Sequence, residues 1–184
     1  MIIGITGTLG AGKGTVAQYL VERHHFVHYS VRALLVEEIE RRGLPVNRDT
    51  MTSVSNDLRA RYGADYLTQQ LLGRALISGD DVVIESIRTV GEATYLKEHG
   101  AQLWAVDADI YTRYARITER ASETDRVSFE KFQFDEQREF SNTDPTKQNI
   151  AGVIKLADTV FHNEGTTEEL YAQIDQILSD SRAV

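Results

Sequence analysis

The first 20 residues constrain the fold of this chain more than any other segment. The run MIIGIT has the composition of a buried β-strand. The pattern after it is helical, because Val16, Tyr19 and Leu20 recur at spacings of three and four residues and share one face. A glycine-rich segment, GTLGAGKGT, joins the two. A strand that turns into a helix through such a loop is typical of α/β folds.

The loop itself has the form Gly7-x-x-x-x-Gly12-Lys13. Glycines allow the backbone N–H groups to face phosphate oxygens, and the N-terminus of the helix adds unpaired donors. Lys13 supplies a mobile positive charge. A flexible glycine-rich turn is the alternative, but the strand before the loop and the helix after it favour a phosphate-binding P-loop (Walker A).

The rest of the chain alternates short apolar runs with helical patterns. Gly63 separates two helical stretches, over roughly 50–61 and 64–78, and Thr166 with Glu169 forms a capping-box pattern before the last helix. The further strand candidates are HFVHYS (25–30), DVVIES (81–86), AQLWAVDA (101–108) and ADTVFHN (157–163). Strands separated by helices predict a parallel sheet with right-handed crossovers in one α/β domain.

Composition limits the partners and the chemistry. The net charge of −8 argues against non-specific binding to nucleic acid or to anionic membranes. The chain has no cysteine, which excludes disulfides and thiolate sites. Because no apolar stretch is long enough for a membrane span and no signal peptide precedes the loop, we expect a cytoplasmic protein with no nucleic-acid and no membrane partner.

An acidic residue ends the most apolar of the predicted strands. In DVVIESIR, Glu85 stands at the carboxyl end, where ligands of open α/β sheets bind. Together with Thr15 it is a candidate for orienting Mg²⁺, while Arg88 can grip a phosphate through two hydrogen bonds. The alternative for Glu85 is an acid that only caps the next segment.

These motifs resemble those of small nucleotide kinases. The loop GTLGAGKGT is similar to that of adenylate kinases, and VVIESIR, LRARYGADYL and ADTVFHNEGTTEEL resemble segments of P-loop nucleoside monophosphate kinases related to adenylate kinase and dephospho-coenzyme A kinase. Two departures stand out. Gly14 separates Lys13 from Thr15, and Glu85-Ser86 replaces the expected Asp-Gly, which leaves open whether Glu85 contacts Mg²⁺ directly or through water.

The resemblance implies a three-layer α/β/α P-loop kinase fold with a five-stranded parallel sheet, in one domain over residues 1–184. Helices over about 30–78 would bind the acceptor, and a short lid would span about 116–128. Asn163, after the last strand, would lie near the adenine. The expected ATP ligands are Gly7, Leu9, Gly10, Ala11, Gly12, Lys13, Gly14, Thr15 and Asn163.

The segment YTRYARITERASETDR supplies arginines for the transition state. Arg113, Arg116 and Arg120 fall within about 60° of one another on a helix. Such arginines stabilise the charge that spreads over a transferring phosphoryl group. A solvated face balanced by neighbouring acids is the alternative, and it weighs most for Arg113. The expected catalytic residues are Lys13, Arg88, Arg116, Arg120 and Arg126.

The acceptor site is less sharply defined by the sequence. Ser30, Arg32, Arg59 and Arg88 are the candidate ligands for the acceptor's phosphate and sugar, whereas Arg61 fits an ordinary surface arginine.

The function expected from these residues is transfer of the γ-phosphoryl group of ATP, with Mg²⁺, to a nucleoside or deoxynucleoside monophosphate. Dephospho-coenzyme A kinase is an alternative, but its hydroxyl acceptor requires a general base that the sequence does not identify. A regulatory module that binds nucleotide without transfer is an alternative of another class. The chain has no NKxD or LSGGQ element, which argues against a GTP switch or an ABC-type ATPase. The choice of base and sugar stays open, as does that between monomer and homodimer.

Overall fold

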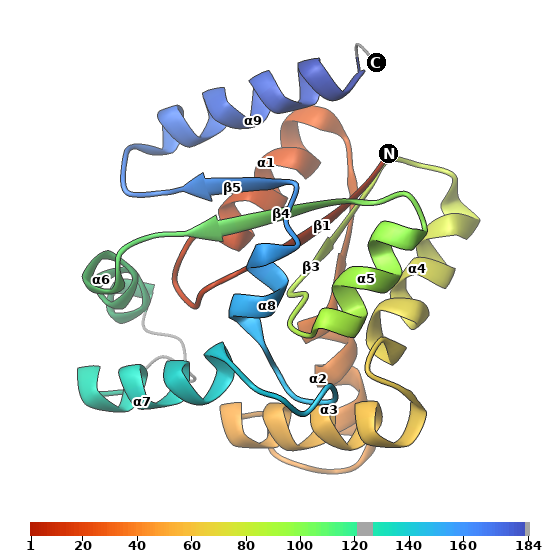
Figure 1. The fold of residues 1–184 in the computed structure, drawn as a ribbon, viewed down its shortest axis with the longest axis vertical. Helices are drawn as coiled ribbons and strands as arrows, with labels where there is room; N and C mark the ends of the chain where they lie inside the picture. The colour runs from red at the N-terminus through yellow and green to blue at the C-terminus, as the bar shows by residue number, and fades with distance from the viewer. Residues whose placement is uncertain (121–126, 183–184) are drawn as a thin grey trace.

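The computed structural model describes residues 1–120 and 127–182. Its five strands form one parallel sheet in the order β2-β3-β1-β4-β5 (Figure 1). The central strand β1 pairs with β3 and β4, and β2 and β5 form the edges. The strand bounds are β1 Ile2–Gly7, β2 Val27–Ser30, β3 Val82–Glu85, β4 Gln102–Asp107 and β5 Thr159–His162. All five predicted strands are therefore confirmed.

Helices cover both faces of this sheet. Alternate strand residues point to opposite faces, so Ile3 and Ile5 pack against one layer of helices while Ile84 and Leu103 pack against the other. The helix bounds are α1 Lys13–His24, α2 Val31–Arg41, α3 Arg48–Tyr62, α4 Tyr66–Ser78, α5 Val90–Glu98, α6 Ile110–Arg120, α7 Phe129–Phe140, α8 Ile150–Lys155 and α9 Thr167–Arg182.

The two helical layers are unequal. α1 and α9 pack together against one face, around Leu20, Trp104 and Ile174 (Figure 1). α2, α3, α4, α5 and α8 share the second core, on the opposite face. This arrangement confirms the expected three-layer α/β/α fold. No helix in the described ranges, 1–120 and 127–182, is both long and apolar enough to cross a membrane.

Several helices begin where the sequence provides a cap. Thr166 and Glu169 form the predicted capping box of α9, with Glu169 N donating to Thr166 Oγ1 (3.2 Å) and Thr166 N to Glu169 Oε2 (2.8 Å). A second capping box, Thr89 with Glu92, begins α5. The periodicity of the sequence predicts neither α5 nor α8, because each is too short for its apolar spacing to stand out.

Because all strands are parallel, their carboxyl ends meet at one edge of the sheet. Gly7, Ser30, Glu85, Asp107 and His162 end the five strands at this edge. It is the edge at which open α/β sheets bind ligands.

Candidate functional site

The loop between β1 and α1 has a backbone that only glycine can adopt. Gly7 has a φ of +131°, and a Cβ there would lie 1.9 Å from the carbonyl oxygen of Val106. Gly12 has a φ of +106°, and its Cβ would lie 2.4 Å from Asn163 Nδ2. Gly12 is also the N-cap of α1 and brings no side chain to cap it. The first N–H groups of the helix are thus left for a ligand.

The side chain of Lys13 folds back over this loop. Its Nζ donates to the carbonyl oxygens of Gly7 (3.0 Å) and Thr8 (2.7 Å), and the residue is only 9% exposed. Burial, followed by the positive charge of Arg88, lowers the pKa of Lys13 to about 7, although the Glu85 carboxylate opposes the shift. A phosphate placed beside Nζ would offset this loss of hydration, so the lysine is arranged to gain an anionic partner.

An open cleft of about 780 Å³ lies in front of the loop. It is lined by Leu9, Gly10, Gly12, Lys13, Gly14 and Thr15 of the predicted ATP ligands. Gly7 and Ala11 are buried and do not line the cleft, and the carbonyl oxygen of Ala11 accepts a hydrogen bond from Asn163 Nδ2 (2.8 Å). The structure therefore places Asn163 as a support of the loop.

The acid at the end of β3 faces the same cleft. Glu85 lines the cleft and forms an ion pair with His28 Nε2 of the neighbouring strand (3.3 Å), whereas His28 does not itself line the cleft. Burial would raise the pKa of Glu85, but the hydrogen bond from His28 and the positive charge of Lys13 outweigh it, and the net shift is downward. The carboxylate is held in its charged form, which a metal ion requires.

Ser86, which follows Glu85, stands where the resemblance predicts a glycine, and its backbone conformation is one that glycine favours. Ser86 has a φ of +76°, in the left-handed region that favours glycine. This turn lets Ser86 N and Ile87 N both donate to the carbonyl oxygen of Ile5, each at 3.1 Å. The serine keeps the backbone geometry that a glycine would provide, at some conformational cost.

The predicted arginines of α6 divide into two groups. Arg116 and Arg120 line the cleft, and Arg116 Nη1 is buried with no hydrogen-bond partner among the residues that the structure describes. Arg113 lies behind them, where its Nε donates to the carbonyl oxygen of Ala108 (2.7 Å) and its guanidinium pairs with Glu136. Arg126 falls outside the described residues.

A smaller cavity, of about 90 Å³, adjoins the cleft. Leu9, Arg32, Ser86 and Arg88 line both spaces, so the two adjoin at these residues. Of the predicted acceptor ligands, all within the described residues, Arg59 lines the cavity but not the cleft, and Ser30 lines neither space. Ser30 instead caps α2, with its Oγ accepting from Ala33 N (3.3 Å).

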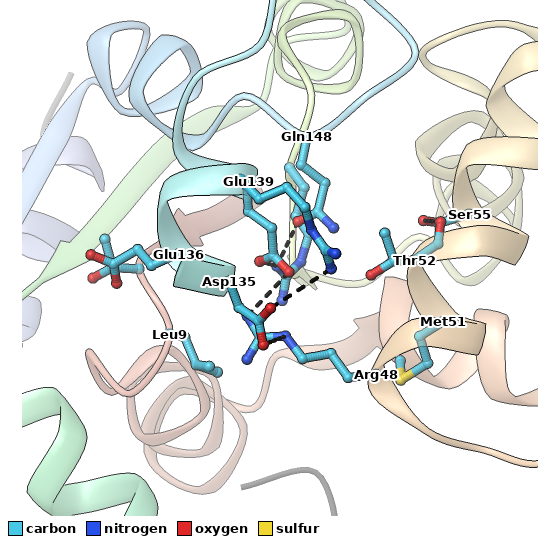
Figure 2. A network of polar contacts seen from close by, with 12 residues as sticks. Leu9, Arg48, Met51, Thr52, Ser55, Asp135, Glu136, Glu139 and Gln148 are labelled. Atoms are coloured by element: carbon cyan, nitrogen blue, oxygen red, sulfur yellow. Dashed lines mark hydrogen bonds and ion pairs between the residues drawn. The ribbon is translucent and has the colours of Figure 1, made fainter. Parts of the chain in front are cut away.

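Among the described residues of α7, Glu139 lines the cavity (Figure 2). Glu139 accepts from Arg88 Nη1 and from Arg48 Nη2, each at 3.1 Å, and Gln148 Oε1 also accepts from Arg88 Nη1 (2.8 Å). Figure 2 shows Asp135 on the same side of α7 as Glu139, and Glu136 directed away from them. The described network thus connects α3, the segment after β3, and α7.

Sequence reasoning missed most of this network. Glu139, Arg48 and Gln148 come from three separate segments, and no local spacing marks them as neighbours. Glu92 did carry a signal, since Thr89-x-x-Glu92 has the spacing of a capping box. That signal predicts the start of α5 but not the contact of Glu92 with Arg59.

The residues of the cleft fit a magnesium ion. Thr15 and Glu85 offer a hydroxyl and a carboxylate oxygen to one space, beside the loop that would hold phosphates. Mg²⁺ bound with a nucleotide commonly takes one or two protein oxygens and completes its shell with phosphate and water.

The sequence is similar to those of known proteins over most of its length. Residues 3–140 match a family described as an AAA domain. A UPF0200 protein of Pyrobaculum aerophilum is 30% identical over 184 residues, which cover 98% of each chain.

Solved structures extend the comparison to the fold. A shikimate kinase from Aquifex aeolicus has a TM-score of 0.55 at 18% identity, over 100% of this chain and 99% of its own. A shikimate kinase from Bacteroides thetaiotaomicron has a TM-score of 0.61 at 14% identity, over 97% and 98%. The fold is therefore that of P-loop kinases.

Proposed function

We propose that this chain, which belongs to the UPF0200 proteins and, over residues 3–140, to the AAA domain family, is an ATP-dependent phosphotransferase. Its fold, which is that of P-loop kinases, supports the proposal. Its acceptor in this proposal is a nucleoside or deoxynucleoside monophosphate. One observation carries the proposal: a second, arginine-lined cavity adjoins the cleft in front of the loop, and Arg32 and Arg88 line both spaces.

The cleft would hold ATP and the cavity its acceptor. The N–H groups at the start of α1 and the ammonium group of Lys13 would bind the β- and γ-phosphates. Thr15 and Glu85 would hold Mg²⁺, which supplies electrostatic stabilisation of the phosphate charge when it is bound. His28 would keep the Glu85 carboxylate in place through their ion pair.

The arginines would act on the transferring group. Arg32 and Arg88 line both spaces and would place the acceptor phosphate next to the γ-phosphate. Arg116 and Arg120, from the opposite side of the cleft, would neutralise charge as the phosphoryl group moves. A phosphate acceptor is already anionic at neutral pH, so this reaction needs no general base.

In this proposal the whole chain works as one kinase domain. The acceptor-binding segment, about 30–78, corresponds to α2, α3 and α4. The proposed lid, about 116–128, begins within α6 and includes residues 121–126, which lie outside the described ranges.

The cavity favours a phosphate over a hydroxyl as the acceptor. A hydroxyl acceptor, such as the ribose of dephospho-coenzyme A, requires a base. Of the described residues that line the cavity, Glu139 is the carboxylate, and it already accepts hydrogen bonds from Arg88 and Arg48. Both of its oxygens are therefore already engaged by guanidinium groups.

The experiment is an acceptor panel. The protein is incubated with Mg²⁺-ATP and each ribo- and deoxyribonucleoside monophosphate, dephospho-coenzyme A or shikimate, and ADP formation is followed. We expect ADP that depends on a nucleoside monophosphate. Turnover with dephospho-coenzyme A alone would show that the proposed acceptor is wrong. Tight ATP binding without acceptor-dependent turnover would indicate a regulatory module instead.

A further inference from the structure

Arg59 and Glu92 form an ion pair inside the molecule, at the wall of the cavity. Arg59 is 1% exposed and Glu92 is 0% exposed. Glu92 Oε1 accepts from both Nε (2.9 Å) and Nη2 (2.7 Å) of Arg59. Its other oxygen accepts from the backbone N–H groups of Arg88 (2.8 Å) and Thr89 (3.1 Å). One carboxylate thus fixes the plane of the Arg59 guanidinium relative to the Arg88 backbone.

The third nitrogen of this guanidinium has no such contact. Arg59 Nη1 is buried and has no hydrogen-bond partner among the residues that the structure describes. A buried donor without a partner costs about 1–3 kcal/mol, and native proteins rarely retain one without a reason. Since Arg59 lines the cavity, a bound molecule is the partner that this donor would gain.

The position of Arg59 shows which part of a bound acceptor it would meet. Arg32 and Arg88 line both the cleft and the cavity, whereas Arg59 lines the cavity alone. The acceptor phosphate must lie at the junction, within reach of the γ-phosphate of ATP. The remainder of the acceptor would then extend toward Arg59.

Charge indicates what kind of atom Arg59 would recognise. Glu92 already balances the positive charge of Arg59, so Arg59 itself does not need an anionic partner. An uncharged atom with a free lone pair would satisfy Nη1. The apolar side chains of Val31, Leu35 and Met51 line the same cavity and suit a flat, uncharged ring.

We propose that Arg59 is a specificity-determining residue that donates a hydrogen bond from Nη1 to an uncharged nitrogen or oxygen of the acceptor's nucleobase. Glu92 is its positioning residue. This inference rests on the proposed function and adds that the base, rather than the phosphate or the sugar, is recognised by the buried end of the cavity.

The test compares a nucleotide with the same molecule lacking its base. Arg59→Lys keeps the charge opposite Glu92 but removes the second arm of the guanidinium. For the best monophosphate of the acceptor panel, we expect kcat/KM to fall about 10- to 100-fold, mainly through KM. The inhibition constant of ribose 5-phosphate, which competes at the phosphate and sugar positions, should change less than about twofold.

Arg61→Lys is the matched control, because Arg61 lies on the same helix, and its exposed side chain pairs with Asp57. It should leave both constants unchanged. An Arg59→Lys enzyme with unchanged kcat/KM, or one that loses ribose 5-phosphate binding to the same extent, would overturn the assignment. Thermal unfolding of both variants shows whether they are folded.

The wild-type protein supplies a second measurement that no variant can obscure. It should bind the monophosphate at least about tenfold more tightly than ribose 5-phosphate, because the base adds a hydrogen bond and apolar contact. Equal affinities would overturn the inference while leaving the phosphotransferase proposal intact. Absence of turnover with every monophosphate would instead overturn the proposed function, and this inference with it.

Discussion

The backbone of Ser86 is strained, because this residue is not a glycine and yet adopts a left-handed conformation. An L-residue in the left-handed region costs roughly 1 kcal/mol, and Ser86 is held there by the turn onto the carbonyl oxygen of Ile5. Ser86→Gly should therefore raise the free energy of unfolding by up to about 1 kcal/mol, after part of the gain is lost to the more flexible unfolded chain. Urea unfolding measures the change, provided that m, the slope of the free energy of unfolding against urea concentration, is the same in both proteins.

Ser86→Ala is the control for this strain, because alanine keeps the Cβ in the same backbone conformation. It should lie close to the wild type in stability. A glycine variant that is less stable than the alanine variant would show that the turn is not strained.

The buried ammonium group of Lys13, which would bind phosphate, lowers the stability of the folded protein. Its pKa is about 7 in the folded protein against 10.5 as the ordinary value. The unfolded chain therefore binds more protons between these values, and stability must rise with pH across that window. Below pH 7 the penalty is present in full, and near pH 10.5 it has disappeared.

The prediction for Lys13→Met follows from this sign. The variant should lose at least about 100-fold in kcat, because the phosphates lose their cation. The stability of the variant relative to the wild type should also fall as the pH rises from 7 toward 10, because only the wild type loses a charge penalty, as measured by urea unfolding. A difference that is independent of pH would contradict the shifted pKa.

For single residues, the sequence predicted the contacts between residues that are close together along the chain. The loop residues and the pair Glu85 and Arg88 share one cleft because each group sits on a single turn. The contact of Arg59 with Glu92 joins residues 33 positions apart, and that of Arg48 with Glu139 joins residues 91 positions apart. Such neighbours depend on how the helices pack, which no local spacing encodes.

Among the elements, α7 connects otherwise separate parts of the site. Its carboxylates pair with Arg48 of α3, Arg88 after β3, and Arg113 of α6. The proposed acceptor phosphate would have to share Arg88 with the Glu139 carboxylate. Figure 2 shows Glu139 at this meeting point of the elements.

Removing that carboxylate should ease acceptor binding. Glu139→Gln is expected to lower the KM for the acceptor about three- to tenfold, because it removes both a competitor for Arg88 and a repulsive charge. The protein should become less stable as the ion pairs with Arg48 and Arg88 are lost. Steady-state kinetics and urea unfolding measure the two effects.

The control is Glu130→Gln, an exposed acid in the first turn of the same helix. It should leave the acceptor KM unchanged. An unchanged or raised KM in Glu139→Gln would indicate that Glu139 orients Arg88 rather than competing for it.

The strands β1, β3 and β4 were predictable as elements because they are buried on both faces and so appear as nearly unbroken apolar runs. The edge strands β2 and β5 are only partly buried and have polar residues at their ends. The longer helices were predictable from their apolar spacing and their caps. The six-residue helix α8 was not, since it spans fewer than two turns and its place depends on contacts with α5 and β1.

For the whole molecule, nucleotide binding should appear as added stability. A ligand at 100 times its Kd contributes about 2.7 kcal/mol to the folded state, which for a chain of this length raises Tm by about 5–10 °C. Scanning calorimetry with Mg²⁺-ATP tests this, and Lys13→Met should show a much smaller shift. An equal shift in the two proteins would place ATP away from the loop.

The order of the strands has a consequence for how the chain folds as it is made. The central strand β1 is synthesised first, yet it hydrogen-bonds to β3 and β4, which follow some 80 and 100 residues later. Its two sheet partners are therefore both present only after Asp107 has been synthesised, so folding is non-local and comparatively slow. A fragment ending at Gly100 should remain open to proteases, whereas the full chain resists them. The strand that leads into the phosphate-binding loop thus obtains both of its neighbours in the sheet only late in synthesis.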